Sequence, residues 1–283
     1  MIKTVLLTGA SGFIGRNILS SLIGMGLKIK ITARDVDGRL LPYIPYVEDI
    51  YKTDDLFSET GDQLCEFCKG VDIVIHAAWY AEPGKYLESR LNQACLDGTV
   101  ALASAAVKAG ISKFVGIGTC FEYDLSGAMQ SISTPLKPLS FYAKCKVDAY
   151  LRLERKFSEA NLSFSWCRVF YLYGESEDSR RLTPFVRQKL TDGELVNLGS
   201  GDAVRDFLDV RIAGQMIAEI AIRDSCVGAF NICSGTPITI KDYCEKIAKD
   251  CNAVHLLRFG ANKEDMSCPV SVVGVPNYTL VEI

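Results

Sequence analysis

The stretch TVLLTGASGFIG, residues 4–15, decides the fold that the rest of the chain must complete. An apolar run is followed by glycines at positions 9, 12 and 15 and then by a helical pattern of apolar residues. A strand, a tight turn and a helix in this order present backbone N–H groups and a positive dipole end to a pyrophosphate. A purely structural turn is the alternative that the spacing alone leaves open. We interpret the stretch as a dinucleotide site formed by Gly9, Ser11, Gly12, Phe13, Ile14 and Gly15.

Short apolar runs alternate with amphipathic stretches as far as about residue 170. The runs read TVLL, KIKIT, DIVIH, KFVGIG and SFSWCRVF, and the helical patterns between them cover residues 13–26, 86–110 and 141–157. This alternation predicts an α/β fold with a Rossmann-type doubly wound parallel sheet. Glycines at positions 24, 26, 70 and 110 fall where helices should end.

The alternation of strand and helix patterns becomes irregular after residue 170. We expect there a helix from Pro184, a strand around 194–198, a helix over 211–222 and a strand over 229–233. We expect residues 1–170 to form the Rossmann domain, with 206–233 returning to it. Residues 171–205 and 234–283 should form a smaller α+β substrate-binding lobe. No flexible linker separates the two parts, so a cleft between packed lobes is expected.

Composition excludes several classes of function. The formal net charge is -3, so the chain has no overall basic field for nucleic acid or an anionic membrane. The N-terminal apolar run is too short for a secretory signal, and no later run approaches the ~20 residues of a membrane-spanning helix. A soluble cytoplasmic protein is therefore expected.

Metal binding and disulfides are not expected either. Eleven cysteines are scattered along a chain with enough apolar residues for a full core, which favours reduced thiols. Cys65 and Cys68 form a CxxC pair, but the only histidines are His76 and His255, and neither supplies a second ligand pair at zinc spacing. A structural role for the pair is favoured over zinc or redox chemistry.

The segment ITARD bears on the choice of cofactor. Arg34 and Asp35 lie nineteen and twenty residues after Gly15, where the next strand should reach the adenosine ribose. A guanidinium suits a 2′-phosphate, whereas a carboxylate accepts from a 2′-hydroxyl. Arg34 favours NADP, and the adjacent Asp35 keeps NAD as the alternative. Either residue could also be a solvated loop charge.

The segment FYAKCK, residues 141–146, carries the candidate chemistry. Tyr142 and Lys146 are four residues apart and share one face of a helix, whereas Lys144 points elsewhere. A free phenol has a pKa of about 10, and bringing it near neutrality needs roughly 4 kcal/mol, which a close ammonium and a nicotinamide cation could supply together. An ordinary helix with a surface lysine and a half-buried tyrosine is the alternative.

Five stretches together carry a resemblance: TGASGFIG, HAAW at 76–79, TCFEY at 119–123, YAKCK at 142–146 and VRDF at 204–207. From residue 3 to about 260 the chain resembles the extended short-chain dehydrogenase/reductases, and within them the nucleotide-sugar epimerases, dehydratases and ketoreductases. The resemblance implies a nicotinamide cofactor, a homodimer and a catalytic set of Thr119, Tyr142 and Lys146. It also implies cofactor contacts from Asp55, Leu56, Ala77, Ala78, Tyr142 and Lys146.

The same resemblance implies that the smaller lobe holds a nucleoside-diphosphate sugar. Arg205 would bind the diphosphate, because a planar guanidinium fork suits phosphoryl oxygens. A pair with Asp202 or Asp206 is the alternative. The other expected substrate contacts are Trp79, Thr119, Cys120 and Tyr171, for whose aromatic members core packing is an equal alternative.

One departure from the family pattern narrows the function. Sugar 4,6-dehydratases of this family carry an Asp-Glu pair directly after the catalytic threonine, where this chain has Cys120 and Phe121, so dehydration is not expected. Cys120 could donate a proton, but a packed side chain is favoured.

We therefore expect an NADPH-dependent reductase of a nucleoside-diphosphate 4-keto-6-deoxy sugar, as in deoxysugar and lipopolysaccharide biosynthesis. An NAD-dependent nucleotide-sugar 4-epimerase is the alternative, because it would use the same three residues. A non-catalytic dinucleotide sensor is a third possibility, but it would need no tyrosine-lysine pair.

Overall fold

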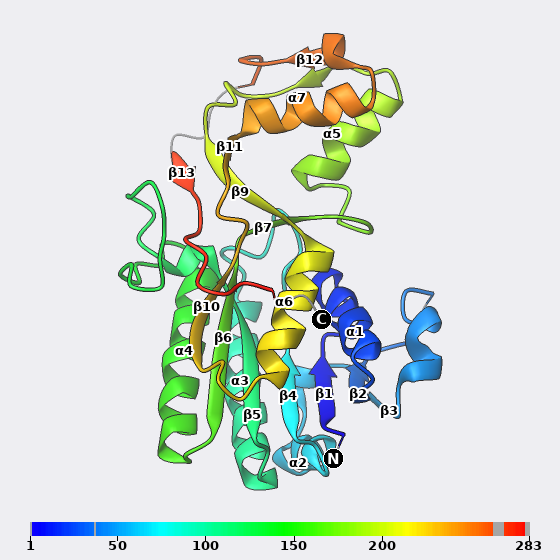
Figure 1. The fold of residues 1–283 in the computed structure, drawn as a ribbon, viewed down its shortest axis with the longest axis vertical. Coiled ribbons are helices and arrows are strands. Elements are labelled where there is room, and N and C mark those ends of the chain that lie inside the picture. The colour runs from blue at the N-terminus through cyan, green and yellow to red at the C-terminus, as the bar shows by residue number, and fades with distance from the viewer. Residues whose placement is uncertain (1, 37, 263–268, 281–283) are drawn as a thin grey trace.

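A seven-stranded parallel sheet forms the centre of the larger lobe (Figure 1). The structure is a computed structural model that describes residues 2–36, 38–262 and 269–280. The strands, in spatial order, are β10 (Gly228–Ile232), β6 (Ser163–Val169), β5 (Lys113–Thr119), β4 (Ile73–His76), β1 (Thr4–Thr8), β2 (Lys28–Ala33) and β3 (Asp49–Lys52). The strand order reverses between β1 and β4, and a crevice at the carboxyl ends of such strands is where ligands bind in doubly wound sheets. The predicted fold is confirmed.

Helices cover both faces of this sheet because successive strand residues point to opposite sides and both sides are apolar. Val5 and Leu7 pack with α1 (Phe13–Gly24) and α6 (Val210–Ile222). Leu6 packs on the other side, where the covering helices are α2 (Gly61–Cys68), α3 (Leu91–Ala109) and α4 (Phe141–Glu159). Short 3₁₀ turns lie between these elements: η1 (Leu41–Tyr46), η2 (Leu56–Ser58) and η3 (Cys120–Glu122).

The smaller lobe stands over the carboxyl ends of the central strands (Figure 1). Its core lies between α5 (Leu182–Thr191) and α7 (Ile240–Asp250). The remaining elements are β7 (Tyr171–Tyr173), β8 (Val196–Asn197), β9 (Val204–Asp209), β11 (Pro237–Thr239), η4 (Val254–Leu256), β12 (Leu257–Arg258) and β13 (Ser271–Val272). Strand β9 pairs with β7, β11 and β13 and leads directly into α6, so the chain joins the two lobes at this strand.

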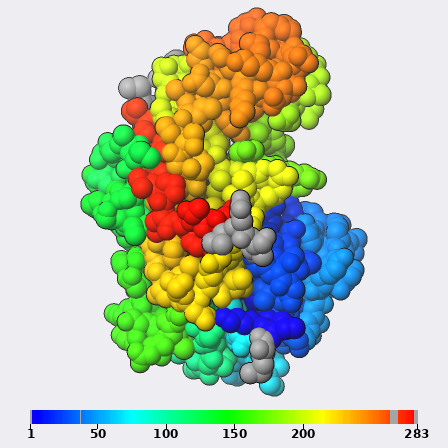
Figure 2. Space-filling model, viewed as in Figure 1, coloured from blue at the N-terminus to red at the C-terminus, as the bar shows by residue number. Residues whose placement is uncertain are grey.

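The C-terminal segment packs on the larger lobe. It crosses the surface over α6 and β10 in Figures 1 and 2. Asn277 donates from Nδ2 to the Ala229 carbonyl (3.0 Å), and the Tyr278 hydroxyl donates to Glu219 (2.8 Å).

Two expected elements differ from the structure. The strand expected around 194–198 is only the two-residue β8. The helix expected over 86–110 begins at Leu91, because other groups hold the preceding backbone: Asn92 donates from Nδ2 to the carbonyls of Tyr86 (2.6 Å) and Ser89 (2.9 Å), and Tyr142 N donates to the Leu87 carbonyl (2.8 Å).

Two findings bear on the compositional expectations. The ten described cysteines are all free. Among the residues that the structure describes, no helix is both long enough and apolar enough to cross a lipid bilayer.

Candidate active site

The glycine-rich turn between β1 and α1 is closely packed against its own backbone. Gly12 N donates to Gly9 O (3.0 Å). A Cβ on Gly15 would lie 2.0 Å from Gly9 O, and one on Gly9, which has φ +73°, would lie 2.6 Å from Ala78 N and 2.7 Å from the Ala77 carbonyl carbon. Gly12 begins α1 without a side-chain cap, so the N–H groups of the first turn remain available to an anion. These residues fit a dinucleotide pyrophosphate.

Asp55 and Leu56 lie beyond the carboxyl end of β3. Asp55 accepts from Phe57 N (3.0 Å) and so begins η2, which buries Leu56. Nearby, the Thr53 Oγ1 atom is buried without a hydrogen-bond partner among the described residues. An unpaired buried hydroxyl at this edge of the sheet fits a site that a polar ligand completes.

Arg34 and Asp35 follow β2 and are both exposed. Asp35 lies 3.8 Å from the Lys52 ammonium at the end of β3. Both signs of charge therefore stand just beyond the carboxyl end of β2.

A chain of hydrogen bonds through His76 fixes the ends of β1 and β4. The Thr99 hydroxyl donates to the Cys95 carbonyl (2.7 Å), so it accepts from His76 Nε2–H (2.8 Å), and His76 Nδ1 accepts from the Thr8 hydroxyl (2.8 Å). Burial, with a smaller effect from Lys146, lowers the pKa of His76 to about 3. His76 is thus a neutral, doubly bonded ring that sets the backbone beside the glycine-rich turn.

Thr119 and Tyr142 approach each other at the carboxyl edge of the sheet. Thr119 is buried at the end of β5, and its hydroxyl is close enough to the Tyr142 phenol to act on the pKa of that phenol, which it lowers. Tyr142 is half-buried in the first turn of α4, which Ser140 begins by accepting from Ala143 N (3.2 Å). The arrangement places two hydroxyl groups side by side at the edge where the crevice opens.

Lys146 lies one helical turn beyond Tyr142 and is buried. Its Nζ donates to the Ile117 carbonyl (2.7 Å), lies 3.7 Å from the centre of the Trp79 ring and 6.0 Å from that of the Tyr142 ring. Burial lowers the pKa of Lys146 to about 7, although Glu122 acts in the opposite direction. Lys144 is exposed, as expected.

The expected lowering of the Tyr142 pKa by Lys146 is not found among the surrounding side chains. Burial raises the pKa of Tyr142 above its ordinary value, Tyr86 and Glu122 raise it further, and the Thr119 hydroxyl opposes them with a smaller effect. The Lys146 ammonium is directed to Ile117 and Trp79 instead.

Glu122 is the nearest carboxylate to this set, and it is fully engaged. It is completely buried and accepts from Thr119 N (2.8 Å), Trp166 Nε1 (3.0 Å) and Arg168 Nε (2.6 Å). A carboxylate held by a buried guanidinium cannot readily act as an acid toward a substrate. Its role is to hold the Thr119 backbone in place.

The residues expected to contact substrate lie where the two lobes meet. Cys120 is buried, and burial raises the pKa of its thiol to about 12, so it is a neutral packed side chain. Arg205 donates to the Val204 carbonyl (2.7 Å), and its guanidinium lies 5.4 Å from the centre of the Tyr171 ring.

The alternative partners proposed for Arg205 do not engage it. Among the described residues, no ion pair joins Arg205 to Asp202 or Asp206, and Asp206 instead accepts from Ser234 N (2.8 Å) and Gly235 N (2.9 Å).

Tyr86 and Arg181 belong to this region but were missed from the sequence. The Tyr86 ring meets the Tyr142 ring edge-to-face at 4.8 Å, and the Arg181 guanidinium lies 5.7 Å from the Tyr86 ring. Burial raises the pKa of the Tyr86 hydroxyl, and Arg181 acts on this hydroxyl in the opposite direction. The sequence pattern placed Tyr86 in a helix. The turn residues Pro83 and Gly84 just before it were the signal that it lies in a loop.

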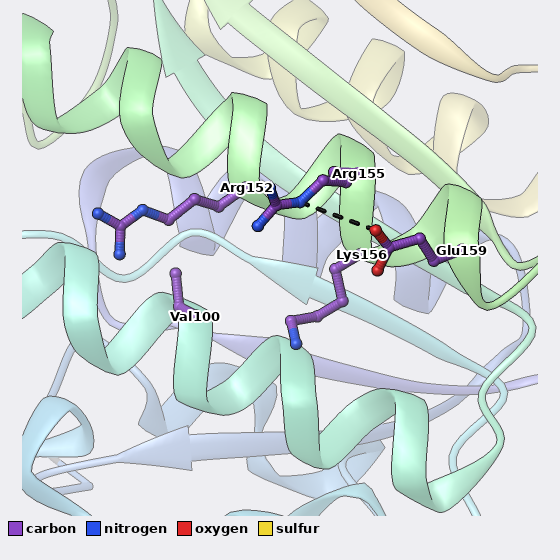
Figure 3. A pocket seen from close by; sticks show the side chains of 5 residues that line it. All are labelled: Val100, Arg152, Arg155, Lys156 and Glu159. Carbon is purple, nitrogen blue, oxygen red and sulfur yellow. Dashed lines mark ion pairs between the residues drawn. The ribbon is translucent and has the colours of Figure 1, made fainter.

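A groove of about 260 Å³ lies elsewhere, between α3 and α4 (Figure 3). It is lined by Val100 and by four charged residues of α4, of which Arg155 and Glu159 are 3.9 Å apart. Of the lining residues on α4, Arg152 is nearest to Tyr142 in sequence and lies ten residues after it. None of the residues expected in the catalytic or binding sites lines this groove.

The sequence matches a known protein family over most of its length. The sequence profile described as the NAD dependent epimerase/dehydratase family matches residues 5–233. The chain belongs to this family. The resemblance drawn from the sequence is therefore confirmed at the level of the family.

Proteins similar to this chain include two named dTDP-6-deoxy-L-talose 4-dehydrogenase. The NAD(+) enzyme of Aggregatibacter actinomycetemcomitans is 24% identical, over 88% of this chain and 90% of its own. The NAD(P)(+) enzyme of Kitasatospora kifunensis is 24% identical, over 87% and 78%. Among solved structures, UDP-glucose 4-epimerase of Thermus thermophilus in complex with NAD has a TM-score of 0.81 at 20% identity, covering 96% of this chain and 90% of its own.

Proposed function

We propose that this chain reduces a keto group on a nucleoside-diphosphate 4-keto-6-deoxy sugar, at C4, with NADPH as the reductant. The observation that carries the proposal is the approach of the Thr119 hydroxyl to the Tyr142 phenol, next to a glycine-rich turn that fits a dinucleotide. The two relatives named as dTDP-6-deoxy-L-talose 4-dehydrogenases support a reaction at C4 of a nucleotide sugar.

The side chains have separable tasks in this reaction. Tyr142 donates a proton to the alkoxide that develops at C4, and Thr119 donates a hydrogen bond to the same oxygen. Lys146 contributes positive charge one helical turn from the phenol. The bound dinucleotide would supply the hydride. Because Glu122 is held by Arg168, it supplies no acid for the loss of water, which argues against a dehydratase.

The raised pKa of Tyr142 suits the reductive direction. A phenol that burial keeps protonated is a proton donor at neutral pH, whereas oxidation would require a phenolate. Arg34 favours NADPH over NADH through its charge.

The remaining assignments belong to the same proposal. Arg205, Tyr171, Cys120 and Trp79 would border the sugar nucleotide. The parts of the chain would divide as a Rossmann domain over 1–170 with 206–233, and a substrate-binding lobe over 171–205 and 234–283. Helices α3 and α4 would pair two copies of the chain in a homodimer in the cytoplasm.

An NAD-dependent nucleotide-sugar 4-epimerase is the second candidate. Asp35 beside Arg34 favours it, because a carboxylate suits the free ribose of NAD. The Thermus thermophilus epimerase, which binds NAD, supports the same fold for that activity.

A panel of dTDP-, CDP-, GDP- and UDP-linked 4-keto-6-deoxy sugars, each with NADPH or NADH, tests the proposal. A reductase consumes stoichiometric NADPH, seen as loss of absorbance of the reduced nicotinamide. If the purified protein instead carries tightly bound NAD and interconverts 4-epimers without consuming NADPH, the epimerase is the right assignment.

A further inference from the structure

The contact between Lys146 and Trp79 is unusually close. The Lys146 ammonium lies 3.7 Å from the centre of the Trp79 ring, closer than any other cation–ring pair described in the structure. Indole is the aromatic ring that attracts cations most strongly, and the attraction grows when the pair is removed from water. Here the ring is an indole, and the ammonium is removed from water because Lys146 is only 4% exposed.

Other groups fix the Trp79 ring in this position. Its Nε1 donates to Asn92 Oδ1 (2.9 Å), and the Asn92 amide in turn donates to the carbonyls of Tyr86 and Ser89. The ring also meets Tyr142 edge-to-face at 6.3 Å. Trp79 is therefore anchored at its edge, while its face is turned to the lysine.

Lys146 needs such a partner. An ammonium has three N–H donors, and the one hydrogen bond described for it goes to the Ile117 carbonyl (2.7 Å). The ionisable groups around it are Glu122 from η3, Cys95 from α3, His76 from β4 and Tyr142 from α4.

These neighbours do little to stabilise the charge of the Lys146 ammonium. Glu122 raises the pKa of Lys146 but is itself bonded to Arg168, and His76 is neutral. Apart from the Ile117 carbonyl, the face of Trp79 is the closest stabilising contact described for the ammonium.

We propose that Trp79 is a positioning residue, which keeps Lys146 charged and directed along the wall of the cofactor crevice, and that Asn92 fixes Trp79 for this task. The inference rests on the proposed function in taking Lys146 to be the cation that serves Tyr142. It gives Trp79 a second role, beside the one proposed for it at the border of the sugar nucleotide.

The experiment follows the lysine Cε carbon resonances by NMR as a function of pH. It uses the full chain without substrate, and a Lys146→Met variant identifies the Lys146 signal. Trp79→Leu removes the aromatic face and keeps apolar bulk, and Trp79→Phe keeps a weaker face. In Trp79→Leu the midpoint of the Lys146 titration should fall by about one pH unit, with Trp79→Phe between Leu and wild type. Equal midpoints in all three proteins would overturn the inference.

Indole fluorescence gives a second test that does not depend on how Trp79→Leu folds. The emission should change as Lys146 loses its proton, and this change should disappear in both Lys146→Met and Trp79→Phe. A change that persists in Trp79→Phe would assign it to Trp166, which also lies 5.9 Å from Lys146, and would contradict the proposed contact.

Neither measurement requires turnover, so the two proposals can fail separately. If no keto sugar is reduced but the titration shifts, the proposed function fails and the role of Trp79 stands. If a keto sugar is reduced but the titration does not shift, the proposed function stands and the role of Trp79 fails.

Discussion

Replacing Glu122 by glutamine should strongly destabilise the protein. The wild-type carboxylate is completely buried and pairs at 2.6 Å with Arg168, which is only 2% exposed. The amide keeps the size of the side chain but removes its charge, so a buried guanidinium is left without its counter-ion. Breaking a buried pair from one side costs about 3–5 kcal/mol, a large part of the 5–15 kcal/mol by which a typical domain is stable.

Urea unfolding at pH 7, followed by circular dichroism, measures this cost. The matched controls are Arg168→Met and the double variant Glu122→Gln with Arg168→Met. Removing both charges relieves the uncompensated guanidinium, so the double variant should be more stable than Glu122→Gln alone. A loss below about 1 kcal/mol in Glu122→Gln would refute the buried ion pair, because exposed pairs contribute that little.

Three further changes probe other parts of the structure. Gly15→Ala should weaken binding of NADPH and NADH by on the order of 100-fold in a fluorescence titration, since its Cβ would lie 2.0 Å from Gly9 O; retained affinity would contradict the close turn. Burial raises the pKa of Glu177 to about 7, so its ionisation opposes folding as pH rises from the unfolded pKa through the folded one. The melting temperature of Glu177→Gln should therefore exceed that of wild type at pH 8 but not below pH ~4.5, the ordinary pKa of glutamate. A difference in melting temperature that stays the same from pH 4 to pH 8 would contradict this expectation. Tyr86→Phe should lower kcat/KM for the keto sugar about tenfold without changing NADPH affinity, through loss of one hydroxyl contact; unchanged kinetics would remove Tyr86 from the site.

Local patterns were sufficient to predict the parallel sheet. The strands predicted from short apolar runs are β1, β2, β4, β5 and β6, and α1, α3 and α4 show the 3.6-residue period, so period and length separate strands from helices. Strand β3 (Asp49–Lys52) has no such run and was not predicted. The glycine-rich turn was equally predictable, because only the absence of side chains permits the contact between Gly15 and Gly9 O. The spacing of Tyr142 and Lys146 placed both on one face of α4.

Long-range contacts decided what the sequence could not predict. Glu122 and Arg168 are 46 residues apart and meet because β5 and β6 align Gly118 with Arg168. The start of α3 at Leu91 depends on a side-chain amide, that of Asn92, holding the backbone before the helix. The Lys146 ammonium on α4 lies over the ring of Trp79, which follows β4. None of these pairings has a signal in local periodicity.

Single-turnover reduction of a 4-keto sugar by wild type and Tyr142→Phe tests the central claim most directly. The claim is that the Tyr142 phenol, placed beside the Thr119 hydroxyl, delivers the proton that completes reduction. The variant keeps the ring and its contact with Tyr86, so NADPH affinity should be unchanged, while the rate of loss of nicotinamide absorbance should fall by about 10²–10⁴-fold. A Tyr142→Phe protein that reduces the sugar at the wild-type rate would contradict the account.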